Sequence, residues 1–357
     1  MNTAAKSYDG ENKYIRITDI DESSSAYDDK DIVSPDGTLS DNYLVKERDI
    51  LLARTGASTG KTYLYRKSDG KLYYAGFLIR ANVTTHNPYF VFSQLHTHRY
   101  WRWVSIMSAR SGQPGINSQE YSSFPVFTTS IQEENKIAKL LSILDERIST
   151  QNKIIEDLKK LKSAIIEIEY SSKTKTSSHI GDFIVQTSKR NKDNAIRTVL
   201  SVSNRRGFIQ QSEQFENRCV ASDDTSNYKI VERNDFAFNP ARINVGSIAR
   251  LITFEKGIVS PMYICFRTKD YATPEYLDYF FESKLFFTEI QKRLEGSVRQ
   301  CLSYESLCNI PFPLLAIEVQ QRIGKQLFTL AQKIKLETDF LEILHKQKQH
   351  LLRQMFI

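Results

Sequence analysis

Two long stretches of the chain share one helical pattern of hydrophobic and polar positions. From Ile131 to Ile166, and again from Ile317 to Leu352, apolar residues recur every three or four positions, as in the seam of a coiled coil. Each stretch predicts a helix of roughly 36 residues, about 54 Å long. The seam residues, which we expect to form the spacer and subunit interface, are Leu141, Leu144, Ile148, Ile155, Leu158 and Ile165 in the first stretch and Leu327, Leu330, Ile334, Leu341, Leu344 and Leu351 in the second.

The two stretches belong to a repeat that covers most of the chain. Every seam residue of the second stretch follows its counterpart by 186 positions. The polar breaks in the seam obey the same offset, because Gln151 and Lys162 correspond to Glu337 and Lys348. Outside the helices the offset relates Asp49 to Asp235, Gly60 to Gly246, and Asn87-Pro88 to Thr273-Pro274.

A narrow apolar seam on so long a helix needs a partner surface. The simplest arrangement packs the two helices against each other as a coiled coil, which would hold two globular domains apart. The alternative is that each helix packs onto its own domain. The polar breaks would then either set the register of the helix pair or mark where other subunits bind.

The expected fold class is α+β, in which a mixed α/β domain and a long helix occur twice. The expected boundaries are 1–130 for the first mixed domain, 131–170 for the first helix, 171–178 for a polar linker, 179–316 for the second mixed domain and 317–357 for the second helix.

Composition and charge are those of an ordinary globular protein. The 357 residues, 40% hydrophobic and 25% charged, suffice for two or three domains. We expect a cytoplasmic protein, because neither a run of about 18 apolar residues nor a signal peptide is visible. The net charge of +7 favours a polyanionic partner only weakly. The cysteines are expected to be free thiols, since none has metal-binding spacing; they are Cys219, Cys265, Cys301 and Cys308.

The segment from Thr55 to Thr62, TGASTGKT, comes close to a nucleotide-binding P-loop. That motif places a leading glycine five positions before Gly-Lys-Ser/Thr so that backbone N–H groups surround phosphates, but Thr55 occupies this position. A P-loop also opens a helix, whereas the residues after Lys61 read as a β-strand. The repeat places Ser247 where Lys61 stands. We therefore expect a loop between two strands and no ATP site.

No other motif predicts catalysis or metal binding. The segment from Asn239 to Arg242 lacks the second proline and the aromatic residue of the adenine-methyltransferase motif. His96 and His98 lie two positions apart on a predicted helix and so do not share a face. We expect no catalytic residue, no metal and no cofactor on this chain.

Polar and basic residues gather on loops at equivalent positions of both repeats. Reading a DNA sequence requires Arg, Lys, Asn and Gln on loops that reach base edges, with further basic groups on phosphates. For any single residue a solvated surface role is an equal alternative, but the set as a whole favours double-stranded DNA. The predicted DNA-binding residues are Arg54, Ser58, Thr59, Lys61, Arg110, Gln113 and Asn117 in the first repeat and Arg205, Arg206, Arg242, Asn244, Arg250, Arg299 and Gln300 in the second.

The order of these segments resembles the specificity subunit of a type I restriction–modification system. The resemblance covers nearly the whole chain. In the first repeat it rests on RDILLARTGASTGKTYLY, GQPGINSQEYSSFPV, EENKIAKLLSILDERI and IIEDLKKLKSAII. Looser second copies are NDFAFNPARINVGSIARL, CLSYESLCNIPFP and EVQQRIGKQLFTLAQKI. No single motif is specific, but the order and the duplication together are.

The resemblance implies two target-recognition domains, each reading one half of a split, asymmetric DNA sequence. It implies that the two helices pair antiparallel as the spacer between the half-sites. Two methyltransferase subunits would dock around this spacer, and restriction/translocase subunits would join them. The specificity subunit would have no catalysis of its own, with AdoMet, ATP and Mg on the partner subunits.

One departure concerns the start of the first domain. The second domain opens with residues 179–183, whose counterparts at an offset of 186 would precede residue 1. We therefore expect the first recognition domain to lack its opening strand. Two other functions stay open: a coiled-coil scaffold that binds only proteins, and the specificity portion of a fused restriction enzyme, for which no methyltransferase motif is visible.

Overall fold

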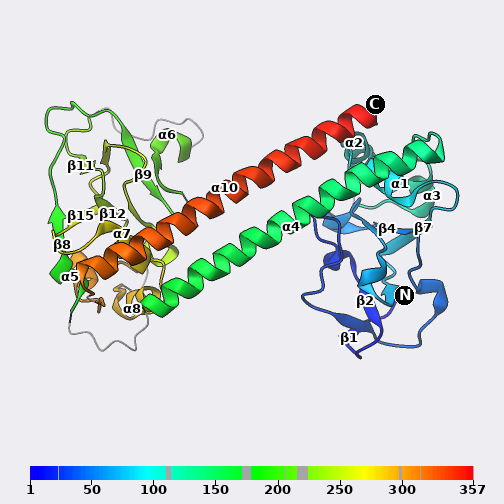
Figure 1. The fold of residues 1–357 in the computed structure, drawn as a ribbon, viewed down its shortest axis with the longest axis horizontal. Helices are drawn as coiled ribbons and strands as arrows, with labels where there is room; N and C mark the ends of the chain where they lie inside the picture. The colour runs from blue at the N-terminus through cyan, green and yellow to red at the C-terminus, as the bar shows by residue number, and fades with distance from the viewer. Residues whose placement is uncertain are drawn as a thin grey trace. The chain divides into compact units, whose positions relative to one another are not determined.

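The structure is a computed structural model that describes residues 1–22, 24–109, 114–170, 178–204, 206–214, 224–296, 300–313 and 315–356. The chain forms two compact units, one made of Met1–Ile154 with Glu337–Ile357 and the other of Ile155–Leu336. Each unit holds one mixed domain and one half of each long helix, α4 (Ile131–Glu169) and α10 (Ile317–Met355) (Figure 1). The predicted α+β class is confirmed, and each long helix contributes to both units.

The first domain builds its core on a short antiparallel sheet of order β5-β4-β7. Its central strand β4 (Asp49–Ala53) is buried at every position, as expected for a strand covered on both faces. Its neighbours are β5 (Thr62–Leu64) and β7 (Leu78–Asn82). Further strands pair as β1 (Ala5–Ser7) with β3 (Val33–Pro35) and β2 (Lys13–Ile15) with β6 (Leu72–Tyr74). The helices α1 (Pro88–Gln94), α2 (His98–Met107) and α3 (Ser118–Ser122) follow.

The second domain contains sheets of order β13-β12-β15-β8 and β10-β9-β14-β11. Their strands are β8 (Ile184–Thr187), β9 (Val199–Ser203), β10 (Gly207–Gln210), β11 (Lys229–Glu232), β12 (Phe236–Phe238), β13 (Ile248–Arg250), β14 (Lys256–Val259) and β15 (Ile264–Thr268). The domain's helices are α5 (Ile180–Phe183), α6 (Gln211–Gln214), α7 (Pro274–Phe280), α8 (Lys284–Arg293) and α9 (Tyr304–Cys308). Stacked rings of Phe236 and Phe266, 5.1 Å apart, join β12 to β15 in the core.

The repeat is visible in the bounds of the helices. α7, α8, α9 and α10 begin and end 186 residues after α1, α2, α3 and α4, respectively. Strand pairing follows the same offset, because Ile50 pairs with Leu64 in one domain and Phe236 pairs with Arg250 in the other. The two copies are therefore alike in how the chain folds as well as in the spacing of their sequences.

Equivalent buried side chains fix the starts of α1 and α7. The carboxylate of Glu134, at 0% exposure, accepts a hydrogen bond from the backbone N–H of Asn87 at 2.8 Å. The amide oxygen of Gln320, also at 0% exposure, accepts one from the N–H of Thr273 at 3.0 Å. Each long helix is thereby attached at its N-terminal end to the mixed domain that precedes it.

Replacing Glu134 by alanine is expected to lower the free energy of unfolding by about 1–3 kcal/mol, because the half-buried N–H of Asn87 loses its acceptor. Glu134→Gln should cost less, since Gln320 already accepts the equivalent bond in the second domain. Urea unfolding of the two variants measures the difference. An alanine variant as stable as the wild type would show that this bond contributes nothing.

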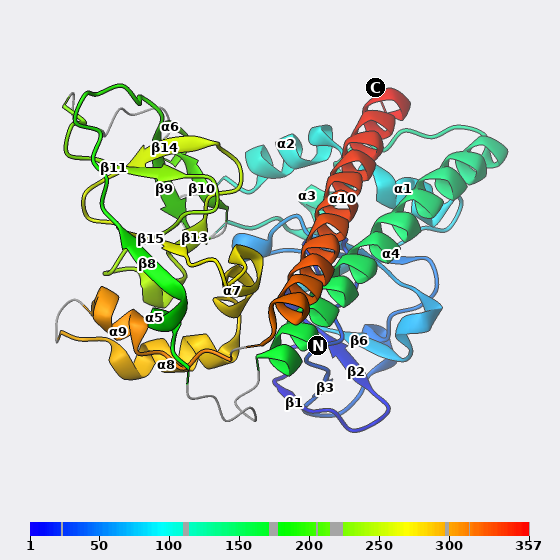
Figure 2. The same cartoon turned by 60° about the vertical axis from the view of Figure 1, so that its left-hand side comes forward.

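In the first unit, α4 and α10 lie side by side and antiparallel (Figure 2). Leu141 of α4 shares an apolar cluster with Leu352 of α10, whereas Leu144 and Ile148 share one with Leu344. Residue numbers thus rise along α4 as they fall along α10. The alternative that each helix packs only onto its own domain is wrong, because the C-terminal half of α10 packs within the first unit.

The second unit contains the other halves of the helices in the same antiparallel sense. Ile166 near the end of α4 shares a core with Ile323 and Leu327 near the start of α10. In both units together, every one of the twelve predicted seam residues is buried or half-buried. The apolar seam therefore packs inward along both helices.

The polar breaks in the seam are engaged with partners inside each unit. In the first unit, Gln151 Nε2 donates a hydrogen bond to the backbone oxygen of Glu337 at 3.1 Å, and Lys348 Nζ lies 2.6 Å from Asp145 Oδ1. In the second unit, Lys162 Nζ donates to the Glu282 carboxylate at 2.7 Å. The contacts of Gln151 and Lys348 join the two helices and favour the interpretation that the breaks set the register of the pair. Lys162 instead joins α4 to the second mixed domain.

The two domains differ at one edge of their central sheets. In the second domain β8 pairs with β15. In the first domain β7 occupies the position of β15, and within the described residues it pairs with β4 alone. The outer residues of β7, Arg80, Ala81 and Asn82, are exposed. The sheet of the first domain therefore has an open edge where the second domain has β8.

Candidate nucleic-acid interface

The loop that joins β4 to β5 carries the first group of predicted DNA-binding residues. It contains the short 3-10 helix η3 (Gly56–Ser58) and turns at Gly60, whose φ of +92° suits glycine. A side chain at Gly60 would come within 2.7 Å of Val104 on α2. The hydroxyl of Tyr100 donates a hydrogen bond to the Gly60 carbonyl at 2.9 Å. The loop is a closed turn held against α2, and a strand follows it as predicted, so it is not a P-loop.

A second segment of the first domain docks directly onto this loop. The backbone N–H of Ile116 donates to the carbonyl of Arg54 at 2.9 Å, and the N–H of Gly56 donates to the carbonyl of Pro114 at 3.0 Å. The hydroxyl of Tyr121 donates to the Ala53 carbonyl at 2.6 Å. The two loops that the sequence singled out separately therefore lie side by side.

The second domain makes the equivalent contact. The N–H of Leu302 donates to the carbonyl of Pro240 at 3.1 Å, and these residues follow Ile116 and Arg54 by 186 positions. The loop between β12 and β13 contains the 3-10 helix η5 (Ile243–Val245). Both domains thus hold their loop against the segment that precedes α3 or α9.

The turn between β9 and β10 lies beside this second loop. Ser247 Oγ donates to the carbonyl of Val202 at 3.3 Å. A Cβ at Gly246 would lie 3.7 Å from the Cβ of Asn204. The turn that contains Arg206 is thereby brought next to the loop that contains Arg242.

The predicted DNA-binding residues differ in how far solvent reaches them. Among those that the structure describes, the exposed ones are Arg54, Asn117, Arg206, Arg242 and Gln300, the half-buried ones are Ser58, Lys61 and Asn244, and the buried ones are Thr59 and Arg250. Arg110, Gln113, Arg205 and Arg299 lie outside the described residues.

Arg250 is a correction to the predicted set. Its side chain is only 5% exposed, and its guanidinium pairs with Glu275 and lies 3.2 Å from Asp278, both on α7. Burial raises the pKa of Asp278 to about 6, although Arg250 counteracts this rise. Arg250 is therefore a buried ion-pairing residue that joins β13 to α7, and its burial keeps its guanidinium away from DNA.

Two other predicted residues have clear local roles. The Thr59 hydroxyl is buried and donates to the Gly56 carbonyl at 2.8 Å, which closes the loop. The Asn117 side chain caps α3 by accepting the N–H of Glu120 at 2.9 Å, and the Glu120 carboxylate accepts the N–H of Asn117 in return. The buried Thr59 hydroxyl is thus not available to a base edge. The cap uses the amide oxygen of exposed Asn117 and does not use its amide nitrogen.

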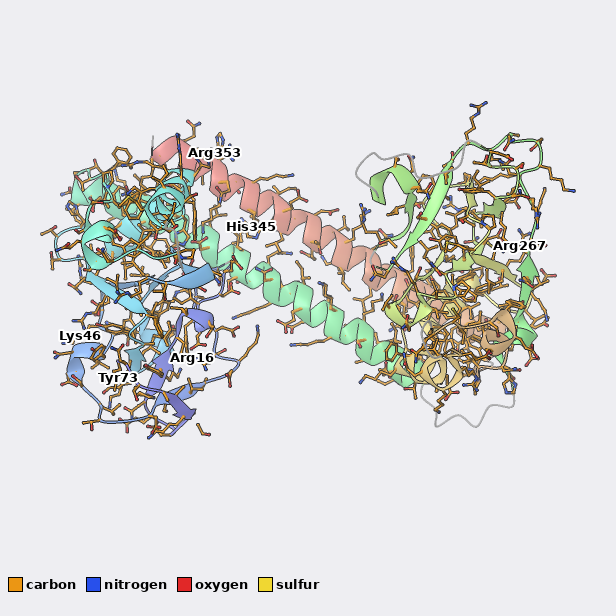
Figure 3. All side chains as sticks on the ribbon, turned by 180° about the vertical axis from the view of Figure 1, so that it is seen from behind. Arg16, Lys46, Tyr73, Arg267, His345 and Arg353 are labelled. Carbon is orange, nitrogen blue, oxygen red and sulfur yellow. The ribbon has the colours of Figure 1, made fainter. Side chains whose placement is uncertain are left out.

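Arg54 and Arg242 are exposed and, unlike Arg16 and Arg267, have no acidic partner among the described residues. Arg16 and Arg267, both labelled in Figure 3, belong to different domains. Arg16 pairs with Asp19 at 2.8 Å, and Arg267 pairs with Asp235 at 3.0 Å. Within the described part of the chain, no carboxylate forms an ion pair with Arg54 or Arg242. An exposed, unpaired guanidinium can meet a phosphate or a guanine without first breaking an internal pair.

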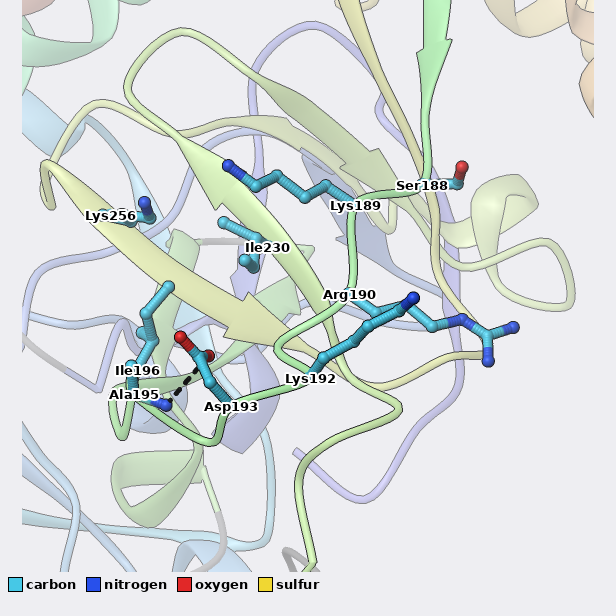
Figure 4. Close-up of a pocket in the computed structure, with 9 residues that line it drawn as sticks. All are labelled: Ser188, Lys189, Arg190, Lys192, Asp193, Ala195, Ile196, Ile230 and Lys256. Carbon is cyan, nitrogen blue, oxygen red and sulfur yellow. Dashed lines mark hydrogen bonds between the residues drawn. The ribbon is translucent and has the colours of Figure 1, made fainter.

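Sequence reasoning missed a basic pocket in the second domain. Its volume is about 780 Å³, and it lies between the segment after β8 and strands β11 and β14 (Figure 4). The basic side chains that line it are Lys189, Arg190, Lys192 and Lys256. Asp193 also lines it but accepts a hydrogen bond from Ala195 N–H at 3.3 Å. The signal was present in the run SKRNK, whereas the addition of Lys256 depends on the fold.

Groups of three or more metal-binding side chains do not occur among the described residues. His96 is used internally, because its Nδ1 lies 3.0 Å from the Phe92 carbonyl and its Nε2 lies 2.9 Å from Ser25 Oγ. Burial lowers the pKa of His96 to about 4.

None of the described helices combines the length and apolar character of a membrane span.

The first domain and its helix match a known family. Residues 1–160 match the family described as the type I restriction modification DNA specificity domain. No match was found among curated proteins.

Solved structures extend the likeness to the second domain. The crystal structure of a type I restriction–modification S subunit from M. genitalium matches with a TM-score of 0.63 and 15% identity, over 98% of this chain and 89% of that one. A chain from a structure that describes complex assembly and conformational transition of a type I R-M system matches with a TM-score of 0.52 and 13% identity, over 96% and 90%. At such low identity the likeness supports a shared fold and nothing more.

Proposed function

We propose that this chain, whose residues 1–160 match the type I restriction modification DNA specificity domain, is a specificity subunit that directs methyltransferase and restriction subunits to one split DNA sequence. Each mixed domain reads one half of the target, and the paired helices separate the halves. The chain supplies recognition without catalysis. AdoMet, ATP and Mg are bound by the partner subunits.

The observation that carries this proposal is the repeated loop arrangement. In each domain a strand-to-strand loop is held by a backbone hydrogen bond to the segment before α3 or α9. Exposed Arg54 stands on this loop in the first domain, and exposed Arg242 stands on it in the second. Two equivalent polar loops on two equivalent domains are suited to two half-sites of one duplex.

The half-sites should differ in sequence, because the loops differ at matched positions. Arg54 corresponds to Pro240 and Lys61 to Ser247. The basic pocket lined by Lys189, Arg190, Lys192 and Lys256 belongs to the second domain. We assign this pocket to phosphate contacts beside the second half-site, which would add to affinity without reading bases.

The helices are suited to act as the spacer. α4 and α10 each contain 39 residues, which corresponds to about 58 Å at about 1.5 Å per residue. Their seam packs inward in each unit, and Gln151 fixes the register by its bond to Glu337. A pair of helices joined in this way resists bending more than either helix alone would.

The outer faces of the helices offer docking surfaces to partner subunits. In the first unit the exposed apolar residues on the helices include Leu140, Ile143, Ile154, Phe340 and Ile343, and in the second they include Leu161, Ile168, Phe328 and Leu336. Apolar side chains that form a contiguous exposed patch mark a protein interaction site, and these residues recur along both helices. We assign these faces to two methyltransferase subunits, with restriction/translocase subunits joining them.

Methylome sequencing of the host tests the proposal. A split methylated motif should be present in the wild type and should disappear when this gene is deleted. The chain assembled with its methyltransferase subunits should also bind duplex DNA, with an affinity that falls as salt rises. If the deletion changes no motif and the assembled complex binds no duplex, the chain is a protein-binding scaffold instead.

Replacing Arg54 by alanine should weaken recognition of one half-site, and Arg242→Ala should weaken the other. The expected cost is about 1–3 kcal/mol for a lost bidentate contact to a base. Competition binding with duplexes altered in either half-site measures it. Arg233→Ala is the control, because Arg233 is exposed and already paired with Glu255. An equal loss of affinity for all duplex sequences would indicate that the two arginines contact phosphates.

A further inference from the structure

An exposed aromatic ring stands at the same position of both domains. Trp101 on α2 is 43% exposed, and Phe287 on α8 is 55% exposed. The two are counterparts at the offset of 186. A single exposed ring needs no explanation, but a ring retained at equivalent positions of two domains does.

The neighbours of these rings differ between the domains. The other exposed positions of the two helices pair as His98 with Lys284, Arg102 with Thr288, Ser105 with Gln291, and Ile106 with Lys292. Charge or polarity changes at three of these four positions, and Ser105 and Gln291 are both neutral and polar. The aromatic ring is the feature that the exposed faces of α2 and α8 have in common, which points to one role served in both domains.

In the first domain the ring lies against the predicted DNA-binding loop. A Cβ at Gly60 would lie 3.0 Å from the ring of Trp101. Trp101 packs edge-on against Tyr100 at 5.6 Å between ring centroids, and the Tyr100 hydroxyl holds the Gly60 carbonyl. Lys61 is the next residue of the loop. Helix α2 therefore fixes the ring and the loop relative to each other.

In the second domain α8 packs against η5 of the equivalent loop. That loop exposes Val245, at 58%, next to Asn244, and it begins at exposed Arg242. Phe287 thus stands on the helix that packs against the loop carrying Arg242. Each domain combines one exposed ring with at least one cation on a loop held against the same helix.

We propose that Trp101 and Phe287 contact DNA as paired aromatic wedges, one in each half-site. Each ring would insert beside a base step or stack on a base, while the cations of the adjacent loop bind the flanking phosphates. Apolar side chains inserted between base steps kink a duplex by about 20–90°. This inference rests on the proposed function and adds to it a mode of recognition that depends on DNA deformability.

DNA accounts for these rings better than a protein partner does. The exposed apolar residues that suit a helical partner lie on α4 and α10. Trp101 and Phe287 instead stand on helices held against loops that carry cations. Of these cations, Arg242 has no ion pair among the described residues, and Lys61 lies 4.0 Å from the exposed carboxylate of Glu22. Aromatic rings combined with basic groups are what proteins use to stack bases while following the phosphate backbone.

The test uses the chain assembled with its methyltransferase subunits and a duplex carrying the split motif. Trp101→Ala and Phe287→Ala should each weaken specific binding by about tenfold, in line with loss of one stacked base. Ile106→Ala on α2 and Val185→Ala on β8 are controls, since both remove an exposed apolar side chain that is not aromatic, and they should change binding less than twofold. Trp101→Phe should retain most of the affinity.

Fluorescence gives an independent readout that does not depend on folding of the alanine variants. The chain has two tryptophans, so Trp103→Phe leaves Trp101 as the only indole. Binding of the specific duplex should quench its emission, and a scrambled duplex should quench it less.

Unchanged affinity in both alanine variants together with unchanged emission would overturn the inference while leaving the proposed function intact. Loss of methyltransferase assembly in Trp101→Ala, with DNA binding kept, would make the ring a protein contact. Absence of DNA binding by the wild-type complex would overturn both proposals.

Discussion

A duplex whose half-sites are moved three base pairs closer should lose specific binding by at least about 100-fold. Removing three base pairs shortens the distance by about 10 Å and rotates one half-site by about 100° relative to the other, given about 10.5 base pairs and 34–36 Å per helical turn. The paired helices cannot follow this change, because their apolar seam is buried in both units and Gln151 is bonded to Glu337. The expected loss of affinity approaches the ratio of the specific affinity to the non-specific affinity.

Competition binding at one fixed salt concentration measures this loss, since affinity for DNA varies steeply with salt. A duplex lengthened by one full helical turn is the matched control, because it restores the rotation while adding about 34 Å. A rigid spacer rejects both duplexes. Retained binding to the lengthened duplex would indicate a flexible connection, and retained binding to the shortened one would refute the spacer altogether.

The helices and the repeat could be predicted because they depend on periodic patterns. A seam with a period of three to four residues is set by helix geometry, so Leu141 and Leu344 could be placed on it from spacing alone. Matching breaks, such as Gln151 and Glu337, revealed the offset. The structure adds that these two counterparts bond to each other, which spacing does not show, because the pairing depends on where the helices cross.

The candidate site was harder to predict because exposure depends on packing. Arg250 and Arg242 both read as basic residues near a loop, yet one is buried and the other exposed. The difference arises from α7, which brings Glu275 and Asp278, three positions apart on one helix face, to the end of β13. Lys256 lines the basic pocket because β14 pairs with β11. No local sequence pattern predicts this pairing.

Removing the Arg250 side chain should be among the most destabilising changes in the second domain. Arg250→Ala leaves Glu275 and Asp278 without their cation at a partly desolvated site, and breaking such a pair costs about 3 kcal/mol. Arg242→Ala, at an exposed loop position, should change the free energy of unfolding by less than about 0.5 kcal/mol. Urea unfolding monitored by circular dichroism measures both.

The first domain supplies the decisive control. At an offset of 186, Leu64 corresponds to Arg250, Tyr89 to Glu275 and Phe92 to Asp278, and in the first domain these side chains pack in one apolar cluster. Replacing a buried ion pair by apolar side chains that fit together is often neutral or stabilising. The triple variant R250L/E275Y/D278F should therefore recover most of the stability that R250A loses. If R250A instead unfolds like the wild type and loses one half-site, Arg250 reads DNA and its buried ion pair does not hold in solution.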